Sequence, residues 1–90
     1  MKYFVYILYS ENYDKFYYGQ TQNVKERLER HNSGTVKSTK KFIPWRIFAL
    51  AEFDTRSEAF KAEKKLKNCK SRERVKDFLK KNKFIILEES

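Results

Sequence analysis

The stretch from Tyr3 to Tyr9 is an unbroken run of apolar and aromatic residues that includes the β-branched Val5 and Ile7. Such a run favours an extended backbone. It lacks the alternation of apolar and polar residues that marks a strand with one face in solvent, so both of its faces must be covered. We therefore expect a central strand, with neighbouring strands beside it and other elements packed on both faces.

A second strand is predicted to return along the first. The polar residues Glu11–Asp14 favour a turn, and the aromatic run Phe16–Tyr18 follows them, so the two stretches predict a hairpin. Gly19 comes directly after the second stretch. A residue without a Cβ atom permits a sharp bend or a close approach to a ligand, so this position is of functional interest.

The next two elements are indicated by helix-capping residues and by an apolar run. Asn23 followed by Glu26 fits a capping box, with Asn in place of the usual Ser or Thr, and predicts a helix over residues 24–33. Gly34 stands where a glycine commonly ends a helix. The apolar residues of 45–53 predict a third strand.

Two more helices and a short tail follow. Thr55 and Glu58 form a second capping box, which predicts a helix to about residue 68, and Ser71 can cap a third helix. Residues 83–87 are expected to form either a terminal strand or a docked tail. The order β-β-α-β-α-α predicts an α/β (α+β) sandwich, in which a small, mainly antiparallel three-stranded sheet is flanked by helices.

Length and cysteine content favour a small cytoplasmic domain. Ninety residues have room for one hydrophobic core, so residues 1–90 are expected to form a single domain. The apolar run near the N-terminus is too short to span a bilayer, which argues against a membrane protein. Cys69 is the only cysteine, so it cannot form an internal disulfide, and we interpret it as an ordinary thiol.

The net charge of +9 is concentrated near the C-terminus. From Arg56 to Lys83 the chain has twelve basic and four acidic side chains, so this stretch carries eight of the nine net charges. A field of this kind attracts polyanions such as nucleic acids. The alternative is a solvated, lysine-rich helix surface. An anionic membrane is a poorer partner, because the stretch lacks an aromatic insertion face.

Residue counts exclude several common kinds of site. One histidine and one cysteine cannot make a structural zinc site, and two glycines cannot make a phosphate-binding glycine loop. No spacing suggests a Ser-His-Asp arrangement. The candidates that remain are single side chains at unusual positions.

Glu63 is one of these, because it lies on the apolar stripe of the predicted second helix. Ala59, Ala62 and Leu66 share that stripe at helical spacing. A carboxylate that faces a sheet is costly unless it is paired, protonated or bound to a cation. A salt bridge, or a place at the rim of the stripe, would explain it without any function. The small alanines leave room beside the carboxylate and favour the functional interpretation.

Four further candidates come from the hairpin and the first helix. Arg27 and His31 are one helical turn apart, and Tyr6 and Tyr17 lie on strands expected to pair. An arginine that points into a cleft can hold a phosphate with two hydrogen bonds. The alternatives are structural: Arg27 lying along the sheet, His31 exposed at the surface, and the tyrosines packed as ordinary aromatics.

Taken together, these residues resemble the GIY-YIG nuclease superfamily. The two halves of its signature match Phe4–Tyr6 and Tyr17–Gly19, ten residues apart, and Arg27, His31 and Glu63 follow at the expected offsets. The pattern covers nearly the whole chain. The resemblance is strongest to the short stand-alone bacterial members, which are described as candidate endonucleases.

The resemblance implies a role for each of these side chains. Tyr17 would be the general base or would position the attacking water, with Tyr6 as its partner across the hairpin. Arg27 would hold the scissile phosphate, and His31 would contact the phosphate or tune Tyr17. Glu63 would be the only protein ligand of a divalent ion, Mg²⁺ or Mn²⁺, and a site with one carboxylate suits Mg²⁺ because this ion keeps most of its waters.

The chain departs from the family pattern at three points. Phe4 replaces the first glycine, Gln20 stands where the repair enzymes have a lysine, and Asn68 is not a clear match for an asparagine that some relatives use. These departures bear on catalytic strength more than on fold. The residues expected to contact nucleic acid are Gln20, Lys37, Lys40, Lys41 and Lys67.

The sequence therefore predicts a metal-dependent endonuclease that hydrolyses nucleic-acid phosphodiester bonds, with DNA favoured over RNA. The alternative is a non-catalytic nucleic-acid-binding module on the same fold, and a protein-interaction domain is a third possibility. A domain this small has no separate module for reading bases. We expect weak sequence preference, with the shape of the nucleic acid or a protein partner supplying specificity.

Overall fold

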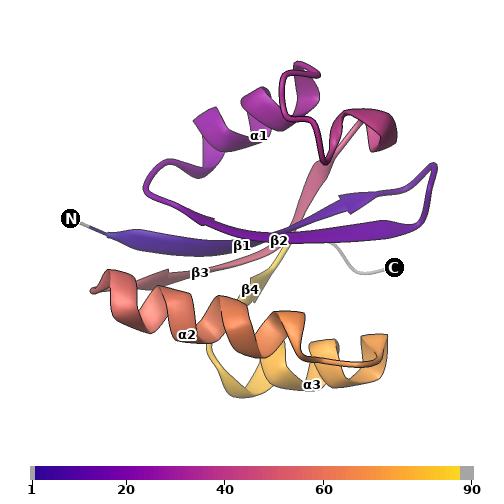
Figure 1. Ribbon diagram of the computed structural model, residues 1–90. Helices are drawn as coiled ribbons and strands as arrows, with labels where there is room; N and C mark the ends of the chain where they lie inside the picture. Colours follow the sequence, from indigo (N-terminus) through magenta and orange to yellow (C-terminus); the bar gives the residue numbers. More distant parts are fainter. Residues whose placement is uncertain (1, 88–90) are drawn as a thin grey trace.

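The computed structural model describes residues 2–87 and shows one sheet with helices on both faces (Figure 1). The hairpin, the three helices and the third strand all form where the sequence predicts them. In chain order the elements are β1 (Tyr3–Ser10), β2 (Lys15–Thr21), α1 (Val24–Asn32), the short 3₁₀ helix η1 (Lys40–Phe42), β3 (Arg46–Phe53), α2 (Arg56–Lys67), α3 (Arg72–Lys81) and β4 (Ile85–Ile86).

The sheet has four strands in the order β2-β1-β3-β4, so β1 is an interior strand, as its apolar run predicts. All of its strand pairs are antiparallel. The prediction of three strands is wrong by one, because Ile85 and Ile86 of β4 pair with Leu50 and Ala49 of β3. A strand of two residues is too short to give a periodic signal, and only its pairing with β3 decides that it is a strand.

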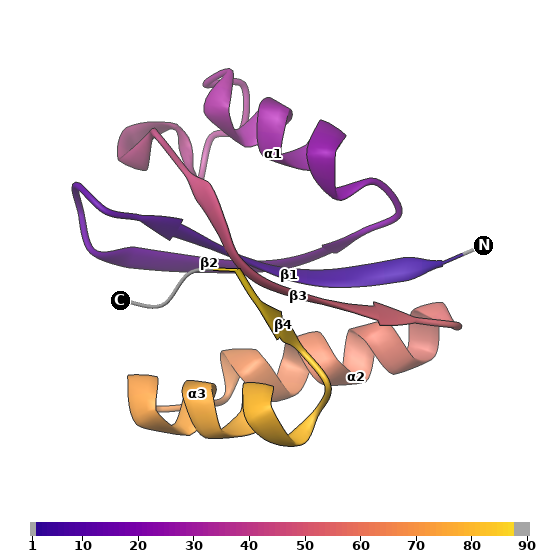
Figure 2. The ribbon, with the colours of Figure 1, turned by 180° about the vertical axis from the view of Figure 1, so that it is seen from behind.

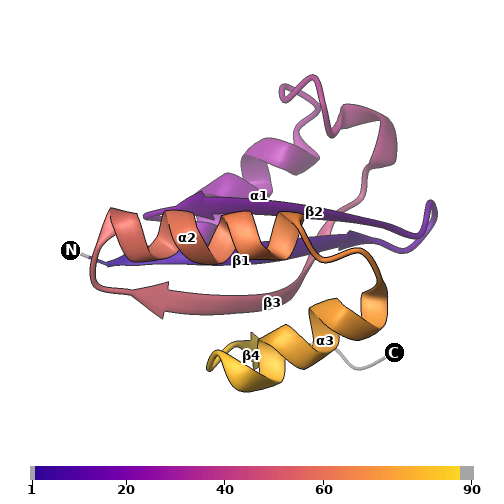
Figure 3. The same ribbon diagram turned by 60° about the horizontal axis from the view of Figure 1, so that its bottom comes forward.

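The two faces of the sheet are covered by different helices (Figures 1 and 2). Val5 and Ile7 of β1 belong to the larger core, which α2 and α3 cover. Tyr6 and Leu8 point to the opposite face and pack beneath α1 in a second cluster that includes Trp45. Figure 3 shows α2 running along the strands, with α3 beside β4. The alternation of β1 therefore sends Tyr6 to the α1 side of the sheet.

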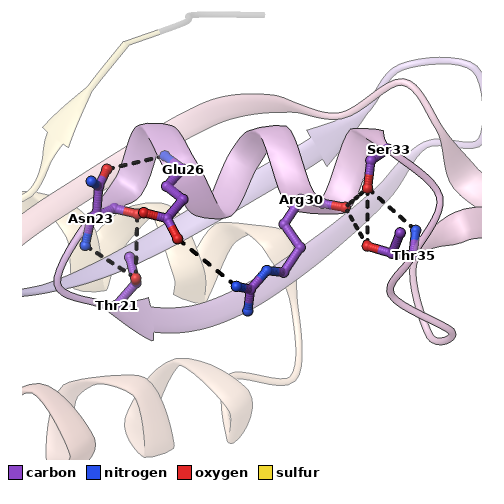
Figure 4. Close-up of polar contacts among 6 residues, drawn as sticks. All are labelled: Thr21, Asn23, Glu26, Arg30, Ser33 and Thr35. Carbon is purple, nitrogen blue, oxygen red and sulfur yellow. Dashed lines mark hydrogen bonds and ion pairs between the residues drawn. The ribbon is translucent and has the colours of Figure 1, made fainter.

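Each α-helix begins at the capping residue that the sequence indicates. The side chains of Asn23, Thr55 and Ser71 accept hydrogen bonds from backbone N–H groups three residues further on, at 3.0, 3.1 and 3.2 Å. The first capping box is only half formed. The Asn23 N–H donates to the Thr21 hydroxyl, and Glu26 pairs with Arg30 instead (Figure 4). Within residues 2–87, no helix could cross a bilayer.

Candidate active site

The strand register places the ring of Tyr6 directly over Gly19. Tyr6 of β1 is paired with Gly19 of β2, and a Cβ atom built on Gly19 would lie 2.5 Å from the Tyr6 hydroxyl oxygen. Real atoms cannot approach so closely, so only glycine fits beneath this ring. Glycine at this point of the signature thus has a packing reason, which complements the prediction that the backbone here is approached closely.

Tyr17 lies beside Tyr6 on the same face of the sheet, because Leu8, the pairing partner of Tyr17, shares that face. The centroids of the two tyrosine rings are 6.4 Å apart. The Tyr17 side chain is half-buried, and within residues 2–87 its hydroxyl has no hydrogen-bond partner. Tyr17 therefore presents a phenol that is available to water or to a ligand.

His31 is buried behind the two tyrosines, which corrects the structural alternative that placed it at the surface. Only 1% of the residue is exposed, and its Nε2 atom is 3.1 Å from the Tyr6 hydroxyl. Its Nδ1 atom is 2.9 Å from the hydroxyl of Thr39. Its ring centroid lies 4.8 Å from that of Tyr17. The arrangement suits an orienting role behind both tyrosines better than a direct contact with a phosphate.

Burial and neighbouring charges hold this network in its neutral form. Burial raises the pKa of Tyr6 far above its ordinary value, Tyr17 and Glu63 also raise it, and Arg27 opposes the shift. Burial lowers the pKa of His31, and Arg27 and Arg30 lower it further. A protonated phenol and a neutral imidazole can share one hydrogen bond in this apolar setting without burying a charge.

Arg27 approaches from α1 and lines a surface pocket of about 340 Å³. Gln20 lines the same pocket, from the residue directly after Gly19. Among residues 2–87, no carboxylate forms an ion pair with Arg27. Its guanidinium group is therefore available to an anionic ligand. Tyr6, Tyr17 and Glu63 do not line this pocket, although we expected all of them to border one cleft with Arg27.

Glu63 reaches the same sheet edge from the opposite face. The Gln20 side chain shares the face of Val5, its pairing partner, and its amide donates to Oε1 of Glu63 at 3.0 Å. Lys67 binds the other carboxylate oxygen, Oε2, at 2.8 Å. Only 14% of the Glu63 side chain is exposed. The salt bridge considered as a structural alternative is therefore present, and Glu63 is a largely buried carboxylate held by two donors.

The separate contacts thus converge on Gly19 and Gln20 of the edge strand. A matching family model agrees with this picture, since that of the GIY-YIG catalytic domain covers residues 2–77. The chain belongs to the GIY-YIG family. Its Tyr6, Tyr17 and Gly19 are the residues of the family signature that the structure brings together on the hairpin.

Individual relatives place the chain among short GIY-YIG proteins. It is 35% identical to the UPF0213 protein YsiG of Lactococcus lactis, over 93% of this chain and 85% of that protein. It is 32% identical to a UPF0213 protein of Limosilactobacillus reuteri, over 87% and 83%. The solution NMR structure of a UPF0213 protein from Bacillus halodurans matches with a TM-score of 0.56 at 30% identity, covering 91% of this chain and 86% of that one.

The structure separates the remaining predicted contacts of this GIY-YIG domain. Lys37, Lys40 and Lys41 are exposed on the segment between α1 and β3. Lys67 and Gln20, by contrast, are engaged with Glu63. The five residues expected to contact nucleic acid therefore do not form one surface. Two of them surround the candidate metal ligand.

Sequence analysis missed Thr39 and Trp45 as supports of the site. Thr39 is 1% exposed and its hydroxyl contacts His31, while its carbonyl accepts a hydrogen bond from the Trp45 indole at 2.9 Å. The segment around Thr39 has no apolar periodicity, so it gave no signal. A tryptophan beside the only proline was the one available hint, because a buried indole needs a hydrogen-bond partner.

Acid is expected to destabilise the fold through His31, the single histidine. Because the pKa of His31 is lowered from 6.5 in the folded chain, the unfolded chain binds a proton that the folded chain does not. The stability linked to the neutral ring is complete above pH 6.5 and falls as the pH drops below that value. Asp14 and Asp54, whose pKa values are lowered from 3.8, act only in more acidic solution.

Urea unfolding at a series of pH values between about 7 and about 5 measures this effect, since stability follows the difference in bound protons. The parent should lose stability as the pH falls, whereas His31→Gln should show a flatter profile from a lower starting point. An NMR titration in which the ring of folded His31 gains its proton at or above pH 6.5 would contradict the expectation.

Proposed function

We propose that this protein is a metal-dependent nuclease that hydrolyses phosphodiester bonds in nucleic acid, with DNA favoured over RNA. One observation carries the proposal, namely that four unlike groups meet at Gly19 and Gln20. The Tyr6 ring lies over Gly19, Gln20 binds Glu63, and Gln20 lines a pocket with Arg27. A phenol, a guanidinium and a carboxylate at one edge supply what phosphodiester hydrolysis needs.

Each side chain has a distinct part in the proposed reaction. Arg27 holds the scissile phosphate and stabilises the charge that develops on it. The unpartnered hydroxyl of Tyr17 orients the attacking water and accepts its proton. A phenol is a weak base at neutral pH, so the positive charge nearby must favour the deprotonated water. Tyr6 and His31 fix the Tyr17 ring from behind.

Glu63 is the residue that would hold Mg²⁺ or Mn²⁺. Within residues 2–87 no three His, Cys, Asp or Glu side chains cluster, so protein ligands beyond one carboxylate are not available there. That donor set fits Mg²⁺, which retains several waters and shares phosphate oxygens with its substrate. When bound, such an ion polarises the phosphate and lowers the pKa of its water. Lys67, whose side chain is 56% exposed, has room to move away from the carboxylate.

A specific observation also favours the second candidate, a nucleic-acid-binding module without turnover. Both oxygens of Glu63 already accept hydrogen bonds, from Gln20 and from the ammonium of Lys67. An ammonium beside the only candidate metal ligand opposes the binding of a second cation. In this alternative the basic C-terminal helices bind the phosphate backbone, and Glu63 is simply a satisfied, buried carboxylate.

A nicking assay on supercoiled, branched and single-stranded DNA separates the two candidates. Tyr17→Phe removes one hydroxyl and leaves the ring in place, so folding and binding should persist. Cleavage should fall about a hundredfold, the low end of the usual loss for a positioned acid–base group. Tyr18→Phe is the matched control, because Tyr18 is the next residue and points to the other face of the sheet. It should cut like the parent.

The assay includes Mg²⁺ or Mn²⁺ and, in a parallel arm, a chelator. Cutting by the parent that the chelator abolishes supports the nuclease. Cutting that is equally strong in the parent and in Tyr17→Phe would assign the activity to a contaminant. A parent that binds DNA tightly and cuts no substrate would favour the non-catalytic module.

A further inference from the structure

A second group of arginines lies in the pocket that Arg27 and Gln20 line. The pocket is formed by the end of β2, the first turns of α1 and the start of α2, and its volume is about 340 Å³. Arg30 of α1 and Arg56 of α2 enter it from two different helices. Figure 4 shows the Arg30 side chain running back along α1 toward Glu26, above the end of β2.

The charges in this pocket favour an anion. Arg27, Arg30 and Arg56 line it, and Glu26 is the only acidic residue among its lining residues. The Glu26 carboxylate lies 3.8 Å from Arg30 in an exposed pair, and pairs of that kind are weak and easily exchanged for another anion. The guanidinium of Arg56 stacks over the ring of Tyr3 at 5.4 Å, which fixes its plane and leaves its N–H groups free in the described chain.

The place of the pocket relative to the proposed cleavage site gives the anion an identity. Arg27 belongs to both, and Arg30 is three residues further along the same helix, so the two side chains are neighbours on its surface. An anion held by Arg30 and Arg56 would therefore sit beside one held by Arg27. In a nucleic-acid strand, the group beside one phosphate is the next phosphate.

We propose that Arg30 and Arg56 clamp the backbone phosphate adjacent to the scissile phosphate on the same strand. This inference rests on the proposed function, because it takes the phosphate at Arg27 as its reference point. Planar guanidinium groups from two helices bind a phosphodiester with paired hydrogen bonds, which sets the direction of the strand across β2. The ligand class is a single-stranded segment carrying at least two phosphates.

The test uses a short probe and needs no cleavage. A 5′-phosphorylated thymidine dinucleotide, which has two phosphates, is titrated into the parent in the presence of a chelator and followed by amide NMR. The expected shifts fall on residues 20–30 and on Arg56. Arg30→Gln and Arg56→Gln should each weaken binding about tenfold, since each loses one charge-assisted contact. Arg74→Gln on α3, also an exposed arginine three residues after a helix cap, should bind like the parent.

Two further probes distinguish other anions from a strand. Inorganic phosphate that binds as tightly as the dinucleotide, at the same residues, would show a free-anion site and overturn the proposal. Shifts confined to α3, or equal affinities for all three variants, would also overturn it. The nicking assay is independent: a parent that cuts DNA while the dinucleotide shifts fall elsewhere retains the proposed function and loses this inference. A parent that cuts nothing but shows the expected shifts loses only the nuclease.

Discussion

Glu63→Gln is expected to lower metal-dependent cleavage about a thousandfold, the upper range for removal of one electrostatic stabiliser of a transition state. The substitution removes the charge that would hold the divalent ion and keeps the size of the side chain. Gln20 can still donate to the remaining carbonyl oxygen, so the packing of α2 against β2 should persist. Loss of the ion pair with exposed Lys67 should cost no more than about 1 kcal/mol of stability.

Asp77→Asn is the matched control for this change. Asp77 pairs with Lys81 at 3.1 Å on α3, with the same four-residue spacing as Glu63 and Lys67 on α2. It should leave cleavage unchanged. Calorimetric titration with Mn²⁺ provides a second measurement, in which only Glu63→Gln should lose binding. Cleavage that stays sensitive to a chelator in Glu63→Gln, at the rate of the parent, would show that another group holds the metal.

Gly19→Ala is expected to damage both the stability and the site. The new Cβ atom would lie 2.5 Å from the hydroxyl oxygen and 2.6 Å from Cζ of Tyr6, so the buried ring must move. Overpacking of this kind costs about 1–3 kcal/mol. Displacement of the ring also breaks its hydrogen bond to His31, which adds about 1 kcal/mol. The melting temperature of a domain this small should fall by about 4–8 °C for each kcal/mol lost.

Gly34→Ala separates loss of stability from loss of the site. Gly34 has a φ of +84°, so alanine is strained there by about 1–2 kcal/mol. The nearest atom to a new Cβ is 3.8 Å away, on Ile43, so nothing is displaced. Gly34→Ala should therefore melt earlier yet cut normally when folded, whereas Gly19→Ala should cut poorly at any temperature. A Gly19→Ala variant as stable as the parent would mean that the Tyr6 ring is not confined.

Local features of the chain were predictable because their causes lie within a few residues. The capping side chains at Asn23, Thr55 and Ser71 bond to N–H groups three residues ahead, so the helix starts followed directly from the sequence. The half-formed capping box at Asn23 shows where this reasoning ends. Thr21 and Arg30 compete for its two partners, and that competition depends on how the chain folds around them.

The candidate site was predicted as a set of residues, but its layout was not. Arg27 and Glu63 lie on helices that cover opposite faces of the sheet, and they meet only because β2 is an edge strand. The tail strand β4, the burial of His31 behind Thr39 and the bond between Glu63 and Lys67 were likewise open in the sequence. Each of these depends on contacts with no local periodicity to mark them, apart from the four-residue spacing of the last.

The sequence by itself determined the helices, the central strand, the excess of positive charge and the residues of the family signature, because periodicity, capping and composition act over short distances. Tertiary structure alone decided which of those residues face one another. Antiparallel pairing set Tyr6 over Gly19, and the alternation of β1 sent Tyr6 to the face of α1. Packing then brought Glu63 to Gln20 from the other side of the sheet, since side-chain direction is fixed only when strands and helices dock.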